Sequence, residues 1–246
     1  KTTCQQFFQN YYPRSGYAFS INTISQLPGG QIAIGGQQTA DATGQKTAMA
    51  LLLSESGTLL WAQEYGDFFS LPAIMDLAPA PDGKLVVVVN LVVDNGNTGL
   101  AKIDLNGNLE WVRFFNAGSN AQVLRVRPTG TGYILTGTGP GTSALILKTD
   151  LNGVQSWSVS ISAPGASMTL HQTWSDPLGG VYAVGTLLQN GFTDGIVLKF
   201  SPAGTLDWSR RYGSSENDAL TELAPTADGQ LLAGGNTFGV DNFNKG

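Results

Sequence analysis

The chain has 246 residues and a mass of 25.9 kDa, enough for one large all-β domain or two ordinary domains. Thirteen Lys and Arg residues against eighteen Asp and Glu residues give a net charge of −5 without any basic run, which argues against nucleic acid as a partner. One cysteine, Cys4, and one histidine exclude an internal disulfide and a typical structural zinc site, and no apolar stretch is long enough to span a membrane.

The composition favours short strands and an extracellular setting. Hydrophobic residues make up 41% and charged residues only 13%, while 32 residues are glycine, which is typical of strands joined by tight turns. Low charge and a single cysteine suit a secreted protein, and a first residue of Lys1 fits a processed export product. We therefore expect an extracellular or cell-surface location.

Glycine landmarks recur at a period of about 49 residues, which indicates a repeat protein. A glycine stands four residues before a tryptophan in four segments, at Gly57 and Trp61, Gly107 and Trp111, Gly153 and Trp157, and Gly204 and Trp208. A second glycine opens a short apolar run in five segments, at Gly30, Gly83, Gly132, Gly180 and Gly229. These landmarks predict about five units, and we assign residues 1–246 to them as a single domain.

Each unit reads as four short strands separated by Gly, Asn, Asp and Pro turns. In the second unit the strands are expected at residues 73–78, 84–93, 99–104 and 109–115, with a hairpin turn at residues 104–108. No segment has a sustained apolar period of 3.6, so we expect no helix. Four-stranded units of this length are typical of propeller blades, so the sequence predicts an all-β, five-bladed β-propeller with four-stranded antiparallel blades.

The two ends of the chain are expected to meet in the fifth blade. Phe8 and Tyr12 have the spacing of Trp61 and Tyr65, which predicts that the N-terminal segment forms the last strand of that blade and closes the ring. The third strand of the fifth blade is either missing or made irregularly by residues 240–243. Two interpretations stay open: the polypeptide continues past Gly246, or another chain, such as a second copy, donates a strand to the open blade.

The segment from Leu100 to Trp111 carries the pattern K-x-D-x-x-G-x-x-x-W. It resembles the repeats of secreted bacterial β-propeller proteins found in tandem at the cell surface. The resemblance extends over all five units, although Lys199-Phe200-Ser201 and Leu52-Leu53-Ser54 lack the Asp. It implies a propeller fold and an extracellular setting, with a function in recognition or assembly.

Four tryptophans share one repeat position, where a wide ring can pack between neighbouring blades. We interpret Trp61, Trp111, Trp157 and Trp208 as structural repeat residues. His171 and Trp174 replace residues that are apolar or aliphatic in the other units, which makes the fourth unit the most unusual of the five. We favour an enlarged core residue for Trp174 and a core or channel-wall role for His171, and the alternative is a shallow ligand site with His171 as hydrogen-bond donor and Trp174 as a stacking face.

A polar side chain recurs seven residues before each second landmark, on the strand expected to be innermost. The residues at this position are Thr23, Asp76, Arg125, Thr173 and Glu222, and Arg127 follows two residues after Arg125. They are expected to line a central channel as solvated or mutually paired groups. A catalytic carboxylate pair is the alternative, and it would need a defined separation of about 5 to 9 Å.

The sequence offers no recognisable catalytic or metal-binding motif. The turns at Asp104 and Asp150 carry too few carboxylates for calcium, and there is neither a nucleophile elbow nor a phosphate-binding loop. We expect no catalytic residue, no metal and no cofactor.

These observations favour a non-enzymatic secreted or cell-surface interaction or structural module, and such a module could be a subunit of a larger surface assembly or filament. Its expected partners are other protein chains, including copies of itself, at the open last blade. A lectin-like propeller that binds glycans in pockets between blades is the second class. A hydrolase or lyase that uses Asp76 and Glu222 in the channel is the least favoured.

Overall fold

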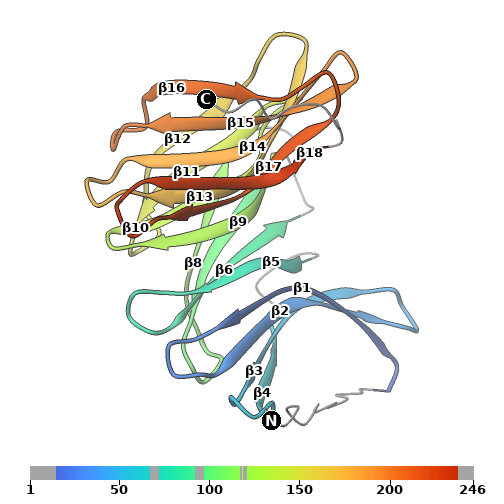
Figure 1. Cartoon of the computed structure of the whole chain (residues 1–246). Coiled ribbons are helices and arrows are strands. Elements are labelled where there is room, and N and C mark those ends of the chain that lie inside the picture. Colours follow the sequence, from blue (N-terminus) through green and yellow to red (C-terminus); the bar gives the residue numbers. More distant parts are fainter. Residues whose placement is uncertain (1–14, 67–71, 92–96, 117, 119–120, 238–246) are drawn as a thin grey trace, which may run out of the picture.

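The structure, a computed structural model, describes residues 15–66, 72–91, 97–116, 118 and 121–237. Every regular element among these residues is a β-strand, so the all-β prediction is confirmed. None of the described elements is a helix that could span a membrane. The strands form four antiparallel sheets of four strands and one sheet of two strands, which follow one another along the chain (Figure 1).

The first two sheets each contain four strands in sequence order. The first sheet contains β1 (Tyr17–Gln26), β2 (Ile32–Ala40), β3 (Lys46–Leu53) and β4 (Leu59–Glu64). The second sheet contains β5 (Pro72–Pro79), β6 (Leu85–Leu91), β7 (Asn97–Ile103) and β8 (Leu109–Asn116). The strands predicted for the second unit are therefore present, with bounds that differ by at most two residues from the expected ones, and residues 92–93 of the expected second strand lie outside the described residues.

The remaining three sheets continue the same order. The third sheet contains β9 (Gln122–Thr129), β10 (Gly132–Thr138), β11 (Ala144–Asp150) and β12 (Gln155–Ile161). The fourth sheet contains β13 (Ala166–Ser175), β14 (Val181–Gln189), β15 (Phe192–Phe200) and β16 (Leu206–Tyr212). The fifth sheet contains β17 (Asp218–Pro225) and β18 (Leu231–Thr237). This arrangement is consistent with a β-propeller.

The hairpin between β7 and β8 has the turn chemistry that the sequence predicts. Gly107 has φ +86°, a left-handed conformation that residues with a Cβ rarely adopt. One carboxylate oxygen of Asp104 accepts hydrogen bonds from the backbone N–H groups of Asn106 and Asn108, both at 2.8 Å. The turn therefore stabilises itself through its own side chains, and this fixes the register of the hairpin.

The hydrophobic core of the described residues lies between successive sheets from the first to the fourth, where the second and third strands carry most of the buried apolar side chains. Glycine makes close packing possible between the first two sheets. A Cβ atom at Gly35 of β2 would lie 2.6 Å from Cγ2 of Ile74 and 2.9 Å from Cδ2 of Leu77, both on β5. Gly35 therefore provides the space that the first strand of the next sheet fills.

The first and fifth sheets are the two ends of this series. Ile21 and Ile24 on β1 are each 66% exposed, whereas Ile74 and Leu77, at the same places on β5, are 0% and 2% exposed. Among the described residues, no strand of the first sheet pairs with a strand of the fifth. The predicted closing strand at residues 8–12 and the irregular third strand at residues 240–243 lie outside the described residues.

Candidate functional site

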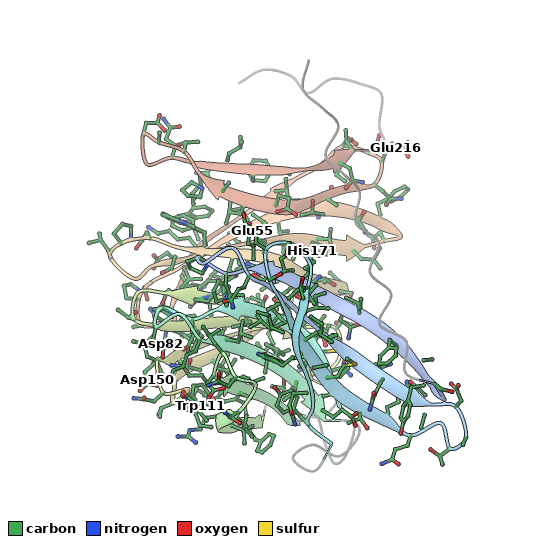
Figure 2. All side chains as sticks on the ribbon, turned by 90° about the horizontal axis from the view of Figure 1, so that it is seen from below. Glu55, Asp82, Trp111, Asp150, His171 and Glu216 are labelled. Atoms are coloured by element: carbon green, nitrogen blue, oxygen red, sulfur yellow. The ribbon has the colours of Figure 1, made fainter. Side chains whose placement is uncertain are left out.

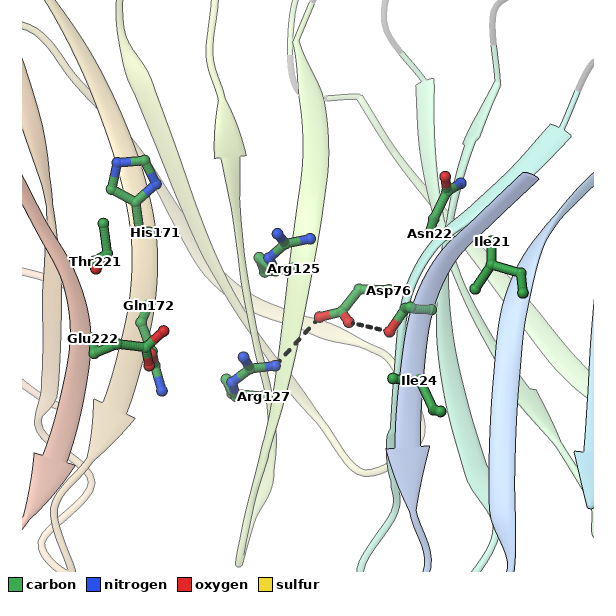
Figure 3. Close-up of a pocket in the computed structure, with 11 residues that line it drawn as sticks. Ile21, Asn22, Ile24, Asp76, Arg125, Arg127, His171, Gln172, Thr221 and Glu222 are labelled. Atoms are coloured by element: carbon green, nitrogen blue, oxygen red, sulfur yellow. Dashed lines mark hydrogen bonds and ion pairs between the residues drawn. The ribbon is translucent and has the colours of Figure 1, made fainter. Parts of the chain in front are cut away.

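The first strands of all five sheets line one central cavity of about 520 Å³. Each of these strands contains a β-bulge, which shifts the register by one residue and turns a polar side chain toward the cavity. The residues that follow the bulges and line the cavity are Thr23, Asp76, Arg125, Gln172 and Glu222. Arg127 and the bulge residue His171 line it as well (Figure 3).

Asp76 connects three sheets. One of its oxygens accepts a hydrogen bond from the hydroxyl of Thr23 at 2.9 Å, in the first sheet. The other accepts from the backbone N–H of Val126 at 2.9 Å and from the guanidinium of Arg127 at 3.3 Å, in the third sheet. The carboxylate is buried. Its oxygens are thus occupied by groups from the neighbouring sheets, which gives Asp76 a structural role at the cavity wall.

Arg125 and Glu222 have no ion-pair partner among the described residues, unlike Asp76 and Arg127. Both side chains are exposed to the cavity, and the guanidinium of Arg125 donates to the backbone oxygen of Leu124 at 3.3 Å. The cavity therefore offers one available cation and one available anion, besides the Asp76 and Arg127 pair.

His171 lies half-buried at the cavity wall. Its Nε2 atom is 3.3 Å from the hydroxyl of Thr186 on β14. Burial lowers the pKa of this imidazole below its ordinary value, and the positive charge of Arg125 lowers it further. The side chain is therefore neutral at pH 7 and serves as a hydrogen-bonding group.

The sequence alignment of the fourth unit is wrong by one residue. Gly179, with φ +87°, is the equivalent of Gly30 with φ +82° and Gly83 with φ +81°, whereas Gly180 has no positive φ. Thr173 therefore does not line the central cavity; it is buried and pairs with Ala183. Gln172 takes its place, and two adjacent glycines in the sequence give no means of choosing between the registers.

The same shift changes the positions assigned to His171 and Trp174. His171 is the bulge residue of β13, equivalent to Asn22 on β1 and Thr221 on β17, and not to the apolar residues before them. Trp174 stands one place beyond the position of Ile24. None of the cavities described for this structure is lined by both residues, so the structure does not bring His171 and Trp174 together in one site.

Trp174 instead belongs to a groove of about 870 Å³ between the fourth and fifth sheets. Its ring lies 5.8 Å from that of Tyr182, which in turn lies 6.1 Å from the ring of Trp208. Tyr212 also lines the groove. Tyr182 was missed by the sequence analysis because a tyrosine in an apolar strand gives no signal of its neighbours.

Three of the repeated tryptophans contact the next sheet. The indole N–H of Trp61 donates to the oxygen of Leu105 at 2.8 Å, and that of Trp157 donates to the oxygen of Pro202 at 3.0 Å. A Cβ atom at Gly153 would lie 2.7 Å from the ring of Trp111, and Figure 2 shows Trp111 beside Asp150, which begins that turn. Gly107, Gly153 and Gly204 thus each make room for the tryptophan of the preceding sheet.

Trp208, the fourth of these residues, lies in a different environment. It is 37% exposed and contacts Tyr182 of its own sheet. Tyr212, four residues later, is 50% exposed, whereas its equivalent Tyr65 is 2% exposed and donates its hydroxyl to the oxygen of Gly107 at 3.0 Å. The face of β16 toward the fifth sheet therefore presents two aromatic rings that are covered at the equivalent places of earlier sheets.

Comparisons with known proteins identify similar solved structures and no family. No family model matches the sequence, and no curated protein matches it significantly. The chain is similar to cobalt-substituted apocarotenoid oxygenase from Synechocystis, at 12% identity and a TM-score of 0.46 over 77% of this chain and 48% of that one. It is also similar to Sqt1 from Chaetomium thermophilum, at 15% identity and a TM-score of 0.48 over 88% of this chain and 66% of that one.

A third similar structure is the β-propeller domain of the Trilobed protease from Pyrococcus furiosus, which has an open velcro topology. The identity is 10% and the TM-score 0.43, over 82% of this chain and 60% of that one. The chain thus spans about half to two thirds of the length of these proteins. At such low identity the likeness concerns the fold alone.

Among the described residues, no group of three or more His, Cys, Asp or Glu side chains is placed to hold a metal ion. The chemistry of the described cavities is therefore that of hydrogen bonds, two available charges and aromatic surfaces. Such groups can bind a polar or aromatic partner.

Proposed function

We propose that this chain is a non-enzymatic interaction module of the cell exterior, and that its partner is a second copy of the chain. The observation that supports this most directly is the aromatic face of β16, where Trp208 and Tyr212 are exposed. Aromatic residues are enriched at protein interfaces because they bury a large area at a small cost in conformational entropy. Their equivalents in earlier sheets contact the following sheet, so this face is suited to accept added strands.

Two features of the cavity favour a binding role over catalysis. A carboxyl group can act as a general acid or a nucleophile only where it can reach a substrate. The oxygens of Asp76 already accept hydrogen bonds from Thr23, Val126 and Arg127. Glu222 has no second available carboxylate beside it among the residues that line the cavity. An extracellular setting is supported by the low charge of the sequence.

We propose further that the sheets close into a five-bladed ring, with the fifth sheet packed against the first. Gly234 on β18 stands in the register position that Gly35 holds on β2, because Glu222 pairs with Gly234 as Thr23 pairs with Gly35. A Cβ atom at Gly234 would have only Cβ of Glu222 within 4 Å, so the space beside it is open. Ile21 and Ile24 of β1 are the equivalents of Ile74 and Leu77, which fill the space beside Gly35, so we expect them to fill the space beside Gly234.

The interaction proposal is tested by the mass distribution of the purified protein, measured by mass photometry together with negative-stain microscopy. We expect oligomers or filaments at micromolar concentration, and their loss in Trp208→Ala with the monomer fold retained. Leu178→Ala is the matched control, because Leu178 is 86% exposed and is not among the residues that line the groove with Trp208. A monodisperse monomer at all micromolar concentrations would contradict the proposal.

Glycan binding is the second candidate function, and the aromatic groove supports it. The groove is lined by three aromatic rings in succession, those of Trp174, Tyr182 and Trp208. Flat aromatic rings of this kind stack on sugar faces. Asp176 and Gln230 add polar groups at its border. A glycan array tests this function, with Trp174→Ala expected to abolish any signal, and an array without binding would contradict it.

A further inference from the structure

The charges of the central cavity divide into a satisfied pair and two available groups. Arg127 and Asp76 contact each other at 3.3 Å, so their charges compensate one another. Arg125 on β9 and Glu222 on β17 remain without an ion-pair partner among the described residues. A cavity with one unpaired charge of each sign is complementary to a ligand that carries both.

We propose that the central cavity binds a short zwitterion of the oligopeptide type, with its carboxylate at Arg125 and its ammonium group at Glu222. The guanidinium presents a planar set of donors that matches a carboxylate, and within the part of the chain that the structure describes its hydrogen bond is a weak one, to the oxygen of Leu124. The carboxylate of Glu222 accepts hydrogen bonds and therefore suits an ammonium group. No cofactor is required.

Neutral groups between the two charges suit the backbone of such a ligand. Gln172 and Glu222 both line the cavity, and Figure 3 shows Arg125 on the strand next to that of Gln172. Gln172 and Thr221 line the cavity with an amide and a hydroxyl, which can donate to and accept from a peptide group. His171, with Nε2 directed to Thr186, adds a neutral ring beside Arg125.

The size of the cavity sets the class of ligand. A volume of about 520 Å³ falls in the range of small-molecule sites, about 300 to 1,000 Å³. It admits a short peptide and excludes a folded domain. A ligand with no net charge also fits a cavity whose four charged residues, two Arg, one Asp and one Glu, sum to zero.

The single histidine of the chain makes the test direct, because His171 gives the only histidine signal in a proton NMR spectrum. Glycine, diglycine and triglycine are titrated into the protein while that signal and the heat of binding are followed. We expect one length to bind best, since only one length matches the separation of Arg125 and Glu222. We expect at least tenfold weaker binding for its N-acetylated form and for its amidated form, each of which lacks one charge.

Two variants assign the charges to their residues. Arg125→Gln should cancel the difference between the peptide and its amide, and Glu222→Gln should cancel the difference between the peptide and its N-acetylated form. The matched controls are Arg210→Gln and Glu216→Gln, because both residues are exposed and lie outside the cavity. Near-ultraviolet circular dichroism verifies the fold of each variant.

Three results would overturn the proposal: no peptide binds up to millimolar concentration, blocking either end has no effect, or both variants bind like the parent protein. Peptide binding in the cavity and self-association through the face of β16 are tested independently. Mass photometry of Arg125→Gln and Glu222→Gln is expected to give the parent distribution, because the face of β16 contains neither residue.

Discussion

The interior interfaces and the two end faces are built from the same repeat positions, yet they differ in burial. Leu77, at an interior interface, packs on the space beside Gly35, while Ile24, at the same position of the first sheet, is exposed. Trp157 contacts the following sheet, while Trp208 is exposed. The burial of a repeat residue is thus decided by its neighbouring sheet, as expected where each unit contacts only adjacent units.

The largest expected change in unfolding free energy comes from a substitution at an interior interface. Leu77→Ala removes a buried side chain from the contact between the first and second sheets and should lower the free energy of unfolding by about 2–5 kcal/mol. Urea unfolding followed by tryptophan fluorescence measures this change. Leu178→Ala is the exposed control and should stay within about 0.5 kcal/mol of the parent protein. Equal losses in both variants would contradict the difference between interior and exposed positions.

The hydrogen bonds of Asp76, which join three sheets at the cavity, should contribute nearly as much to the free energy of unfolding. Asp76→Asn keeps the size of the side chain but removes the charge that Arg127 contacts, and its NH₂ group replaces one of the two oxygens that accept from Thr23, Val126 and Arg127. Since Arg127 is partly exposed, we expect a loss of about 2–3 kcal/mol in unfolding free energy. Asp207→Asn is the control, because that carboxylate forms an exposed pair with Lys199 at 3.9 Å. An unchanged unfolding free energy in Asp76→Asn would show that the contact between Asp76 and Arg127 does not contribute to stability.

The end faces provide the sharpest form of the comparison. If the fifth sheet closes on the first, Ile24→Ala should cost about 2 kcal/mol, approaching the effect of Leu77→Ala. If the face of β1 stays in water, the change should be below about 0.5 kcal/mol. Urea unfolding of the two variants side by side decides between these outcomes, and the smaller change would contradict ring closure.

The sequence predicted the parts of this molecule that depend on local patterns. The glycine before each tryptophan and the Asp104 turn follow from residues within five places of one another, and both were located correctly. Contacts between residues about 50 places apart leave no such local signal. The hydrogen bonds from Thr23 and Val126 to Asp76 are of this kind, and so is the groove that joins Trp174 to Trp208.

The predicted register of the fourth unit was wrong for a different reason. Gly179 and Gly180 are adjacent, and only the backbone conformation shows which of them makes the turn. An error of one residue in a strand exchanges its two faces. Thr173 was therefore assigned to the cavity and Gln172 was missed, although the equivalent positions in the other four units were assigned to residues that do line it.

The smallest expected effect concerns the pH dependence of the fourth sheet. Burial, together with Arg125, holds the pKa of His171 below its ordinary value of 6.5, so the unfolded chain takes up a proton before the folded chain does. The free energy of unfolding should therefore fall as the pH drops below 6.5 toward the pKa of the folded state. Above pH 6.5, His171 should make no contribution to the pH dependence of stability. His171→Gln should be less sensitive than the parent protein to the change from pH 7.5 to pH 5.5, as measured by urea midpoints. Arg125→Gln should raise the pKa of His171 in an NMR titration, and an unchanged pKa would show that the two side chains do not interact.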